Sequence, residues 1–135
     1  MSACRRILVT EDNDDTRELI VRILEKAGYS VDSAANGVEA FKKLESAKEP
    51  TLIFLDLMMP VMDGWHFLKD RRRGEHRVVT ISAVHLNTMD DLIDGDGVDG
   101  NLQKPLFSAD ILMMAERFCG KPGAKSEDKP NEMFP

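Results

Sequence analysis

Short apolar runs alternate along this chain with stretches in which apolar residues recur at helical spacing. The apolar runs predict buried strands, and the helical stretches predict amphipathic helices that cover them. The expected strands are Arg6–Thr10, Tyr29–Ala34, Thr51–Leu57, Val78–Ser82 and a short strand around Leu102. The expected helices are Thr16–Ala27, Val38–Ser46, Trp65–Arg72, a short or loose helix within His85–Asp94, and a last helix capped by Ser108. This alternation predicts an α/β fold in which helices pack on a doubly wound parallel sheet.

The same patterns predict which side chains form the core. The segment 51–57, TLIFLDL, is nearly all apolar, which is typical of a central strand that is covered on both faces. Asp56 is therefore a conspicuous residue, because it stands at the end of a strand that is otherwise apolar. In the first helix the expected core stripe consists of Leu19, Ile20, Ile23, Leu24 and Ala27.

Length and charge limit the classes of function. The chain has 135 residues, with 18 Lys and Arg against 24 Asp and Glu, and its net charge is −6. This acidic balance disfavours direct binding to nucleic acid, which requires clustered basic residues. No apolar run approaches the roughly 18 residues that a membrane span needs. Residues 1–119 are expected to form one domain, and residues 120–135, which lack apolar periodicity, a disordered tail or linker.

Cys4 and Cys119 are the two cysteines of the chain. They are far apart and lack the paired spacing that is typical of zinc sites and of redox motifs. The sequence therefore predicts neither a disulfide framework nor a zinc site. Because no secretion signal is recognisable either, the reducing cytoplasm is the expected location.

Polar residues that could bind a ligand or take part in a reaction stand at the carboxyl ends of the predicted strands. Glu11 and Asp12 follow the first strand, Asp56 ends the third, Ser82 ends the fourth, and Lys104 lies just beyond the fifth. The carboxyl ends of parallel strands converge at one edge of the sheet, so these groups are expected to meet there. Carboxylates held close together repel one another, which raises their pKa values or recruits a hard divalent cation such as Mg²⁺. Such a pocket suits a phosphoryl group, with one carboxylate available as its acceptor.

Four segments in the order of a known pattern make the chain resemble the receiver domain of two-component response regulators, of the stand-alone, single-domain type. They are ILVTEDN (7–13), FLDLMMPVMDG (54–64), ISA (81–83) and LQKP (102–105), and the resemblance extends over about residues 5–118. It implies a flavodoxin-like fold with five helices and a five-stranded parallel sheet of order 2-1-3-4-5.

The resemblance also implies a role for each matching residue. Asp56 would be the phosphoacceptor, Ser82 would bond the phosphoryl oxygens, and Lys104 would pair with them. The family's Mg²⁺ ligands correspond to the carboxylates of Glu11, Asp12 and Asp56 and to the backbone carbonyl of Met58.

A receiver of this kind would take a phosphoryl group from the phosphohistidine of a sensor histidine kinase or of a histidine phosphotransfer protein. It would signal through contacts with a downstream protein target, without binding nucleic acid or a membrane. It would not be an enzyme with a turnover substrate, because it would catalyse only its own phosphorylation and dephosphorylation. Charge neutralisation and positioning are the main requirements of this reaction.

Two other functions remain open at this stage. A phosphorylation-independent interaction module with the receiver fold is favoured by Asn101, which stands where many receivers have an aromatic switch residue, and it is disfavoured by the intact acidic set. A Mg²⁺-dependent phosphatase or hydrolase with Asp56 as a transient nucleophile is weaker, since neither a second general acid nor a substrate cap is evident.

Overall fold

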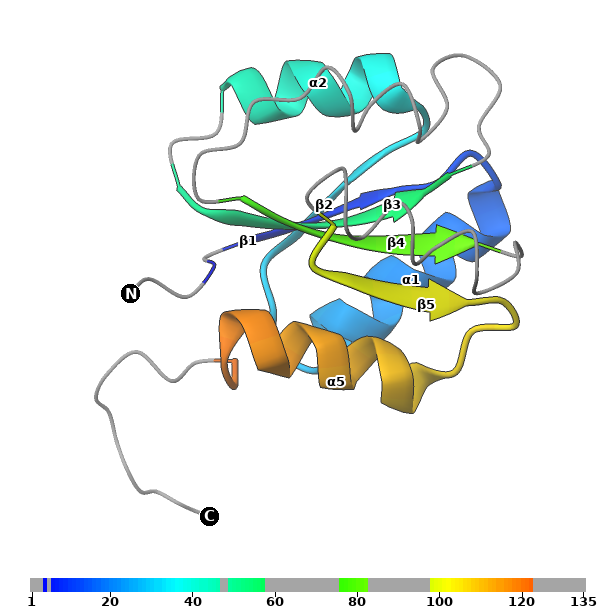
Figure 1. Cartoon of the computed structure of the whole chain (residues 1–135), viewed down its shortest axis with the longest axis vertical. Coiled ribbons are helices and arrows are strands. Elements are labelled where there is room, and N and C mark those ends of the chain that lie inside the picture. Colours follow the sequence, from blue (N-terminus) through cyan, green and yellow to red (C-terminus); the bar gives the residue numbers. More distant parts are fainter. Residues whose placement is uncertain (1–3, 5, 47–48, 58–75, 83–97, 123–135) are drawn as a thin grey trace.

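The computed structural model describes residues 4, 6–46, 49–57, 76–82 and 98–122, and its centre is a sheet of five parallel strands (Figure 1). The strand order β2-β1-β3-β4-β5 confirms the expected order 2-1-3-4-5. The strands are β1 (Arg6–Thr10), β2 (Val31–Ala34), β3 (Thr51–Asp56), β4 (Arg77–Ser82) and β5 (Gly100–Gln103).

Helices cover both faces of the sheet, as a doubly wound fold requires. Helices α1 (Asp14–Lys26) and α5 (Ser108–Cys119) lie on one face, and α2 (Gly37–Glu45) lies on the other (Figure 1). The helices expected within 65–72 and 85–94 lie outside the described residues. Within the described part, no helix is long and apolar enough to cross a membrane.

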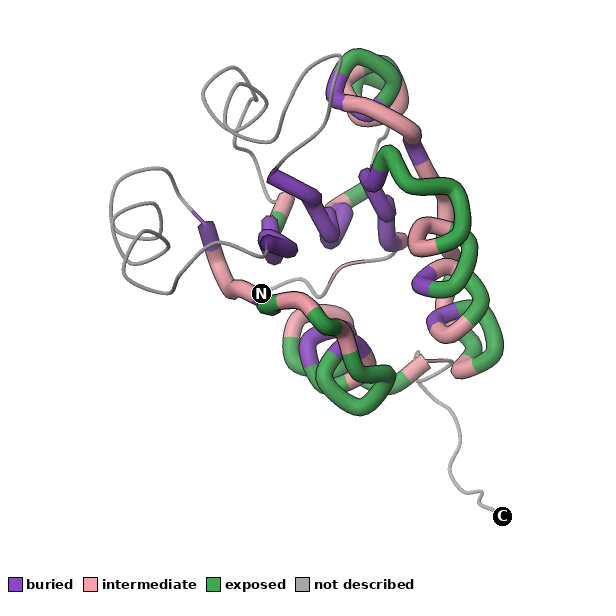
Figure 2. Tube along the Cα trace, turned by 90° about the vertical axis from the view of Figure 1, so that its right-hand side faces the viewer, coloured by how far each residue is buried: buried purple, intermediate pink, exposed green. Residues whose placement is uncertain are grey.

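The core consists of two apolar layers, one on each face of the sheet. The central strand β3, whose residues are all buried, contributes to both layers. Ile53 and Leu55 belong to the layer under α2, while Leu52 and Phe54 belong to the layer under α1 and α5. Figure 2 shows this arrangement as buried strand residues at the centre and exposed outer sides on the helices. The prediction of a central strand covered on both faces is therefore confirmed.

Helix α1 begins two residues earlier than predicted, because Asn13 caps it. The Asn13 side chain accepts a hydrogen bond of 2.8 Å from the amide of Thr16, which stabilises the first turn. Ile20 and Leu24, one turn apart, are fully buried, but Leu19 is 56% exposed. The prediction that Leu19 belongs to the core was wrong, since it lies about 100° around the helix from Ile20 and outside the buried stripe.

Helix α5 also differs from its prediction at the amino end. Its N-cap is Phe107, which makes no side-chain cap hydrogen bond, and Ser108 is the first helical residue instead of the cap. The buried side of α5 is formed by Ile111, Met114 and Ala115. Packing of this apolar face, not capping, therefore holds α5 on the sheet.

Charged side chains surround the edge strand β2. Asp32 on β2 accepts a hydrogen bond of 3.1 Å from Arg6 of β1 and another of 2.9 Å from Lys43 of α2. Lys43 also donates to the backbone carbonyl of Ser33. These contacts join α2 to the outer strand through polar groups that remain partly exposed.

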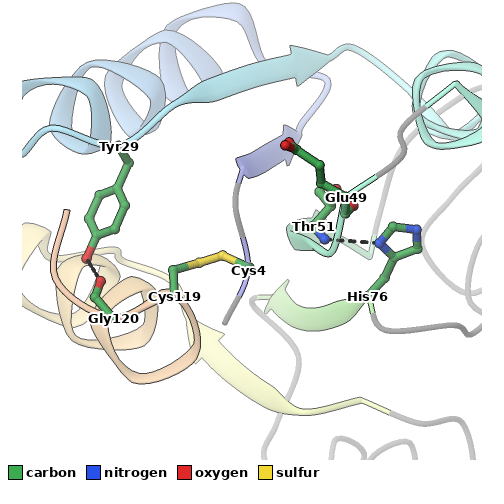
Figure 3. Close-up of a disulfide and its surroundings, with 7 residues drawn as sticks. All are labelled: Cys4, Tyr29, Glu49, Thr51, His76, Cys119 and Gly120. Carbon is green, nitrogen blue, oxygen red and sulfur yellow. Dashed lines mark hydrogen bonds between the residues drawn. A yellow bond between two sulfur atoms is a disulfide. The ribbon is translucent and has the colours of Figure 1, made fainter. Parts of the chain in front are cut away.

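A disulfide joins Cys4, just before β1, to Cys119, the last residue of α5 (Figure 3). Their Cα atoms are 4.5 Å apart although 115 positions separate them in the sequence. The expectation of no disulfide was wrong, because the fold, and not the local spacing, brings the two cysteines together. The cysteines therefore lend no support to a reducing location.

The replacement of Phe54 by Ala tests the importance of the central strand. Phe54 is fully buried, so Phe54→Ala is expected to lower the free energy of unfolding by about 3 to 5 kcal/mol in urea denaturation. The exposed Leu19 supplies the control, since Leu19→Ala should change stability by no more than about 0.5 kcal/mol. Equal losses from the two variants would contradict this description of the core.

Candidate functional site

The carboxyl edge of the sheet is held by backbone hydrogen bonds that continue the strand pairing past the strand ends. Each bond fixes a segment that carries a predicted site residue. They run from the Glu11 amide to the Ala34 carbonyl (3.1 Å), from the Leu57 amide to the Ile81 carbonyl (3.2 Å), and from the Lys104 amide to the Ser82 carbonyl (2.9 Å). The site is thus built on the rigid sheet, which limits the movement of its side chains.

Strand register places two acids side by side. Thr10 of β1 pairs with Leu55 of β3, so the next residues along the two strands are Glu11 and Asp56. Glu11, Asp56 and the neighbouring Asp12 each offer a carboxylate oxygen, and these oxygens lie within 4.8 Å of one another. Glu11 is 1% exposed and Asp56 is 3% exposed, whereas Asp12 is open to solvent. The acidic cluster is therefore buried at its base and accessible from one side.

Lys104 faces the buried part of the acidic cluster. Its Nζ lies 3.7 Å from Glu11 Oε1 and 3.9 Å from Asp56 Oδ2. These distances allow charge attraction but are too long for hydrogen bonds. One ammonium group beside three carboxylates leaves the cluster with excess negative charge.

The carboxyl group of Glu11 is the most perturbed group of the cluster. Oε2 accepts a hydrogen bond of 3.1 Å from the Asn13 amide, but Oε1 is buried and has no hydrogen-bond partner in the described part of the chain. Burial, followed by the hydrogen-bonding and charge effects of Asp56, raises the pKa of Glu11 to about 7. The Asn13 amide and Lys104 oppose this rise.

A buried carboxylate oxygen without a hydrogen-bond partner, beside two further carboxylates, fits a hard divalent cation. Such ions take oxygen ligands and keep several waters, so they need only a few protein groups and an open side. The exposed position of Asp12 supplies that open side. The donor set of the acidic cluster therefore matches Mg²⁺ in chemistry.

Arg17, a residue to which the sequence assigned no role, holds the segment that carries the first two acids. Its guanidinium group donates a hydrogen bond of 2.9 Å to the Glu11 carbonyl and a second one to the Asp14 carboxylate. The segment between β1 and α1 is thus fixed from the helix side as well as by the sheet. The only signal in the sequence was the position of Arg17 in the first turns of a helix that follows an acidic pair.

The structure brings most of the predicted site residues together. Glu11, Asp12, Asp56 and Lys104 meet, and Ser82 lies buried at the same edge, at the end of the strand beside Asp56. Met58, whose carbonyl was expected to complete the cation site, lies outside the described residues.

Asn101, the departure from the usual aromatic residue, faces β4. Its side-chain Oδ1 accepts a hydrogen bond of 3.0 Å from Thr80, which is fully buried. The side-chain amide of Asn101 is thus held by β4. Its partner, Thr80, lies two residues before Ser82 on this strand.

A doubly wound parallel sheet with an acidic cluster at the carboxyl ends of its strands is typical of a class of α/β domains that bind ligands at these strand ends. Residues 7–116 match the family model of the response regulator receiver domain, and the chain belongs to this family. Receiver domains are in general signalling modules, not enzymes with a turnover substrate, and they interact with histidine kinases.

Curated relatives and solved structures agree with this assignment. The transcriptional regulatory protein HprR of Escherichia coli is 33% identical over 109 residues, which are 79% of this chain and 48% of HprR. The receiver protein CpdR of Brucella abortus is 46% identical over 61 residues, 44% of this chain and 49% of CpdR. The chain thus spans about half the length of HprR, and its match to CpdR covers about half of that protein.

Among solved structures, the chemotaxis protein CheY4 of Vibrio cholerae has a TM-score of 0.77 and 28% identity, covering 86% of this chain and 99% of that one. The receiver domain of the hybrid histidine kinase CckA has a TM-score of 0.70 and 32% identity, covering 84% of this chain and 98% of that one. Both similarities extend over nearly the whole of the compared chains, so they concern the entire domain and not a local motif.

The raised pKa of Glu11 predicts how stability depends on pH when divalent cations are removed by a chelator. Folded Glu11 holds its proton up to about pH 7, whereas its ordinary pKa is 4.5. The folded state therefore binds more protons than the unfolded state in this window. The free energy of unfolding should fall by up to about 3 kcal/mol as pH rises from below 4.5 to above 7.

Urea denaturation at a series of pH values measures this dependence. In the matched variant Glu11→Gln the titrating group is absent, so this part of the fall should disappear. An identical fall in both proteins would show that other groups cause it.

Proposed function

We propose that this protein is a receiver that accepts a phosphoryl group on Asp56 from a phosphohistidine donor in a Mg²⁺-dependent reaction, and that it signals through contacts with other proteins. The observation that carries the proposal is the placement of Asp56. It is buried at the end of the central strand, beside Glu11 and Asp12 and 3.9 Å from Lys104. A structural carboxylate in an apolar strand has no need of such neighbours.

Each residue of the site has a distinct task in this reaction. A carboxylate oxygen of Asp56 forms the new bond to phosphorus, while the bond between phosphorus and the donor imidazole breaks. Lys104 neutralises negative charge on the phosphoryl oxygens, and the Ser82 hydroxyl donates a hydrogen bond to one of them. Both groups lie on neighbouring strand ends, so they need little rearrangement to act.

Glu11, Asp12, Asp56 and the Met58 carbonyl would hold the Mg²⁺ ion. When bound, this ion would supply positive charge that offsets the repulsion between the acidic cluster and an incoming phosphoryl group. In its absence Lys104 faces Glu11 and Asp56, and burial together with the neighbouring Asp56 raises the pKa of Glu11 to about 7.

The proposed partners are proteins. The donor would be a sensor histidine kinase or a histidine phosphotransfer protein, and the phosphorylated form would be recognised by a downstream protein target. The net charge of −6 argues against direct recognition of nucleic acid by this domain. We place the reaction in the cytoplasm, where ATP-dependent kinases operate.

A second candidate function is a phosphorylation-independent interaction module. The hydrogen bond that holds Asn101 to Thr80 favours it, because a fixed amide replaces the side chain that many receivers reorient. The two functions differ in one measurable property, which is whether Asp56 is modified.

The first experiment is intact mass measurement after incubation with a small-molecule phosphodonor. The protein should gain one phosphoryl group in the presence of Mg²⁺ and none in the presence of a chelator, and Asp56→Asn should gain none in either condition. A folded, Mg²⁺-binding protein that gains no mass would favour the phosphorylation-independent module.

The role of Arg17 predicts a specific change in the Mg²⁺ dependence of this reaction. Arg17→Ala removes two hydrogen bonds that hold the acidic segment, so the Mg²⁺ concentration for half-maximal phosphorylation should rise by about 10-fold. At saturating Mg²⁺ most of the rate should return, because the reacting groups themselves are unchanged.

Arg22 provides the matched control on the same helix. It makes an exposed ion pair of 3.7 Å with Glu18, and Arg22→Ala removes the same charge without touching the acidic segment. Its Mg²⁺ dependence should match that of the wild-type protein. Equal shifts in the two variants would show that charge alone, and not positioning by Arg17, is responsible.

A further inference from the structure

Several contacts meet at the carboxyl end of α5. This end lies near the amino ends of the strands, whereas the acidic cluster lies at their carboxyl ends. Besides the disulfide, the Cys4 amide donates a hydrogen bond of 3.3 Å to the Phe118 carbonyl. The Tyr29 hydroxyl donates one of 2.8 Å to the Gly120 carbonyl (Figure 3). The end of α5 is thus joined both to the segment before β1 and to the segment after α1.

Packing around Gly28 adds a further contact at this end. Gly28 has a φ of +107°, which favours glycine, and a Cβ built there would lie 3.0 Å from the Cβ of Pro122. The absence of a side chain at position 28 therefore lets the chain after α5 lie against the end of α1. Gly120 and Pro122 thus both contact the segment that follows α1.

These non-covalent contacts do not depend on the bond between the sulfur atoms. A reduced protein that keeps them would still hold the Cys4 and Cys119 thiols next to each other, so the bond can open and close without unfolding. Both cysteines are partly exposed, which gives a small thiol or disulfide access to them.

We propose that Cys4 and Cys119 form a redox modification site, at which thiol–disulfide exchange with a low-molecular-weight disulfide reversibly fastens the end of α5 to the start of β1. With oxidised glutathione, the thiolate of one cysteine attacks a glutathione sulfur and releases one glutathione thiolate. The second protein thiolate then attacks the protein sulfur of the mixed disulfide and releases the other. Two protein thiols are oxidised, and one glutathione disulfide is reduced to two thiols, which take up the two protons.

The bond has two physical consequences. It closes a loop with a sequence separation of 115 residues, which restricts the unfolded chain and so stabilises the folded domain. It also fixes the far end of α5, a helix that begins four residues after Lys104 of the acidic site. Oxidation therefore limits how far the end of α5 can move, while the acidic site at the opposite edge stays open.

The test is a redox titration of the full chain with mixtures of reduced and oxidised glutathione. Free thiols are alkylated at equilibrium and counted by intact mass. A transition from two free thiols to none within the range of mixtures supports the proposal. A bond that persists in reduced glutathione alone, or that never forms in oxidised glutathione alone, overturns it.

Thermal stability and amide hydrogen exchange of the oxidised and reduced protein test whether the disulfide fastens the end of α5. Reduction should lower the melting temperature by an amount on the order of 10 °C. Exchange of the Cys4 and Gly120 amides should become at least several-fold faster, since both amides bond to the last turn of α5. Equal melting temperatures and equal exchange in the two forms would overturn the proposed fastening.

The variants Cys4→Ser and Cys119→Ser separate the effect of the bond from the effect of the reagents. Each should behave like the reduced wild-type protein in melting and exchange, and its remaining thiol can form only a mixed disulfide with glutathione, which intact mass distinguishes from the internal bond. A response of these variants equal to that of the wild-type protein would count against the site.

Phosphorylation of Asp56 is a separate readout, because the cysteines do not contact the acidic cluster. The redox transition is expected whether or not Asp56 accepts a phosphoryl group. A failure of the proposed function and a failure of the redox site are thus distinguishable in the same preparation.

Discussion

The pairing of β1 with β3 is the constraint on which the rest of the site depends. Because Thr10 pairs with Leu55, the residues that follow, Glu11 and Asp56, leave the sheet at neighbouring points. A shift of one residue in this register would turn Asp56 to the other face of the sheet and bury polar groups in an apolar layer. The two apolar layers around β3 enforce the register, so the core determines which carboxylates meet.

Burying Glu11 and Asp56 side by side is unfavourable in free energy, because the two carboxyl groups lose hydration and repel each other. The surrounding groups have to offset this cost. Two carboxyl groups that are nearly inaccessible to water lie within 4.8 Å of each other, and a single ammonium group stands slightly too far away to hydrogen-bond either one. The protein tolerates this through protonation of Glu11 near neutral pH and through backbone support for the segments that carry the acids. The electrostatic balance of the site is therefore sensitive to any charge that is added close to the acidic cluster.

The sequence predicted the features that depend on local pattern and on the general geometry of parallel sheets. Acids at strand ends had to converge, so Glu11, Asp12, Asp56 and Lys104 could be brought together without a structure. The order of the strands came from the resemblance to receivers, because periodicity alone does not determine which strands are neighbours.

Other features depend on contacts between distant parts of the chain and were missed or misjudged. The link between Cys4 and Cys119 requires the first strand and the last helix to meet at one edge, and the local sequence contains no sign of this. Leu19 belongs to an apolar pattern but lies outside the buried stripe, since the width of the contact with the sheet decides which residues are covered. Arg17 acts on a backbone carbonyl, a partner that no side-chain motif reveals.

The charged surroundings of β2 have a consequence for behaviour at high concentration. An edge strand offers unpaired backbone groups to which a strand of another molecule can add, and such addition leads to aggregation. Here β2 has only four residues, and Asp32, Arg6 and Lys43 form a partly exposed group of charges around it. A foreign strand that adds beside β2 would remove part of these charges from water, which is unfavourable. The short length of β2 and the charges around it thus act against strand addition at this edge.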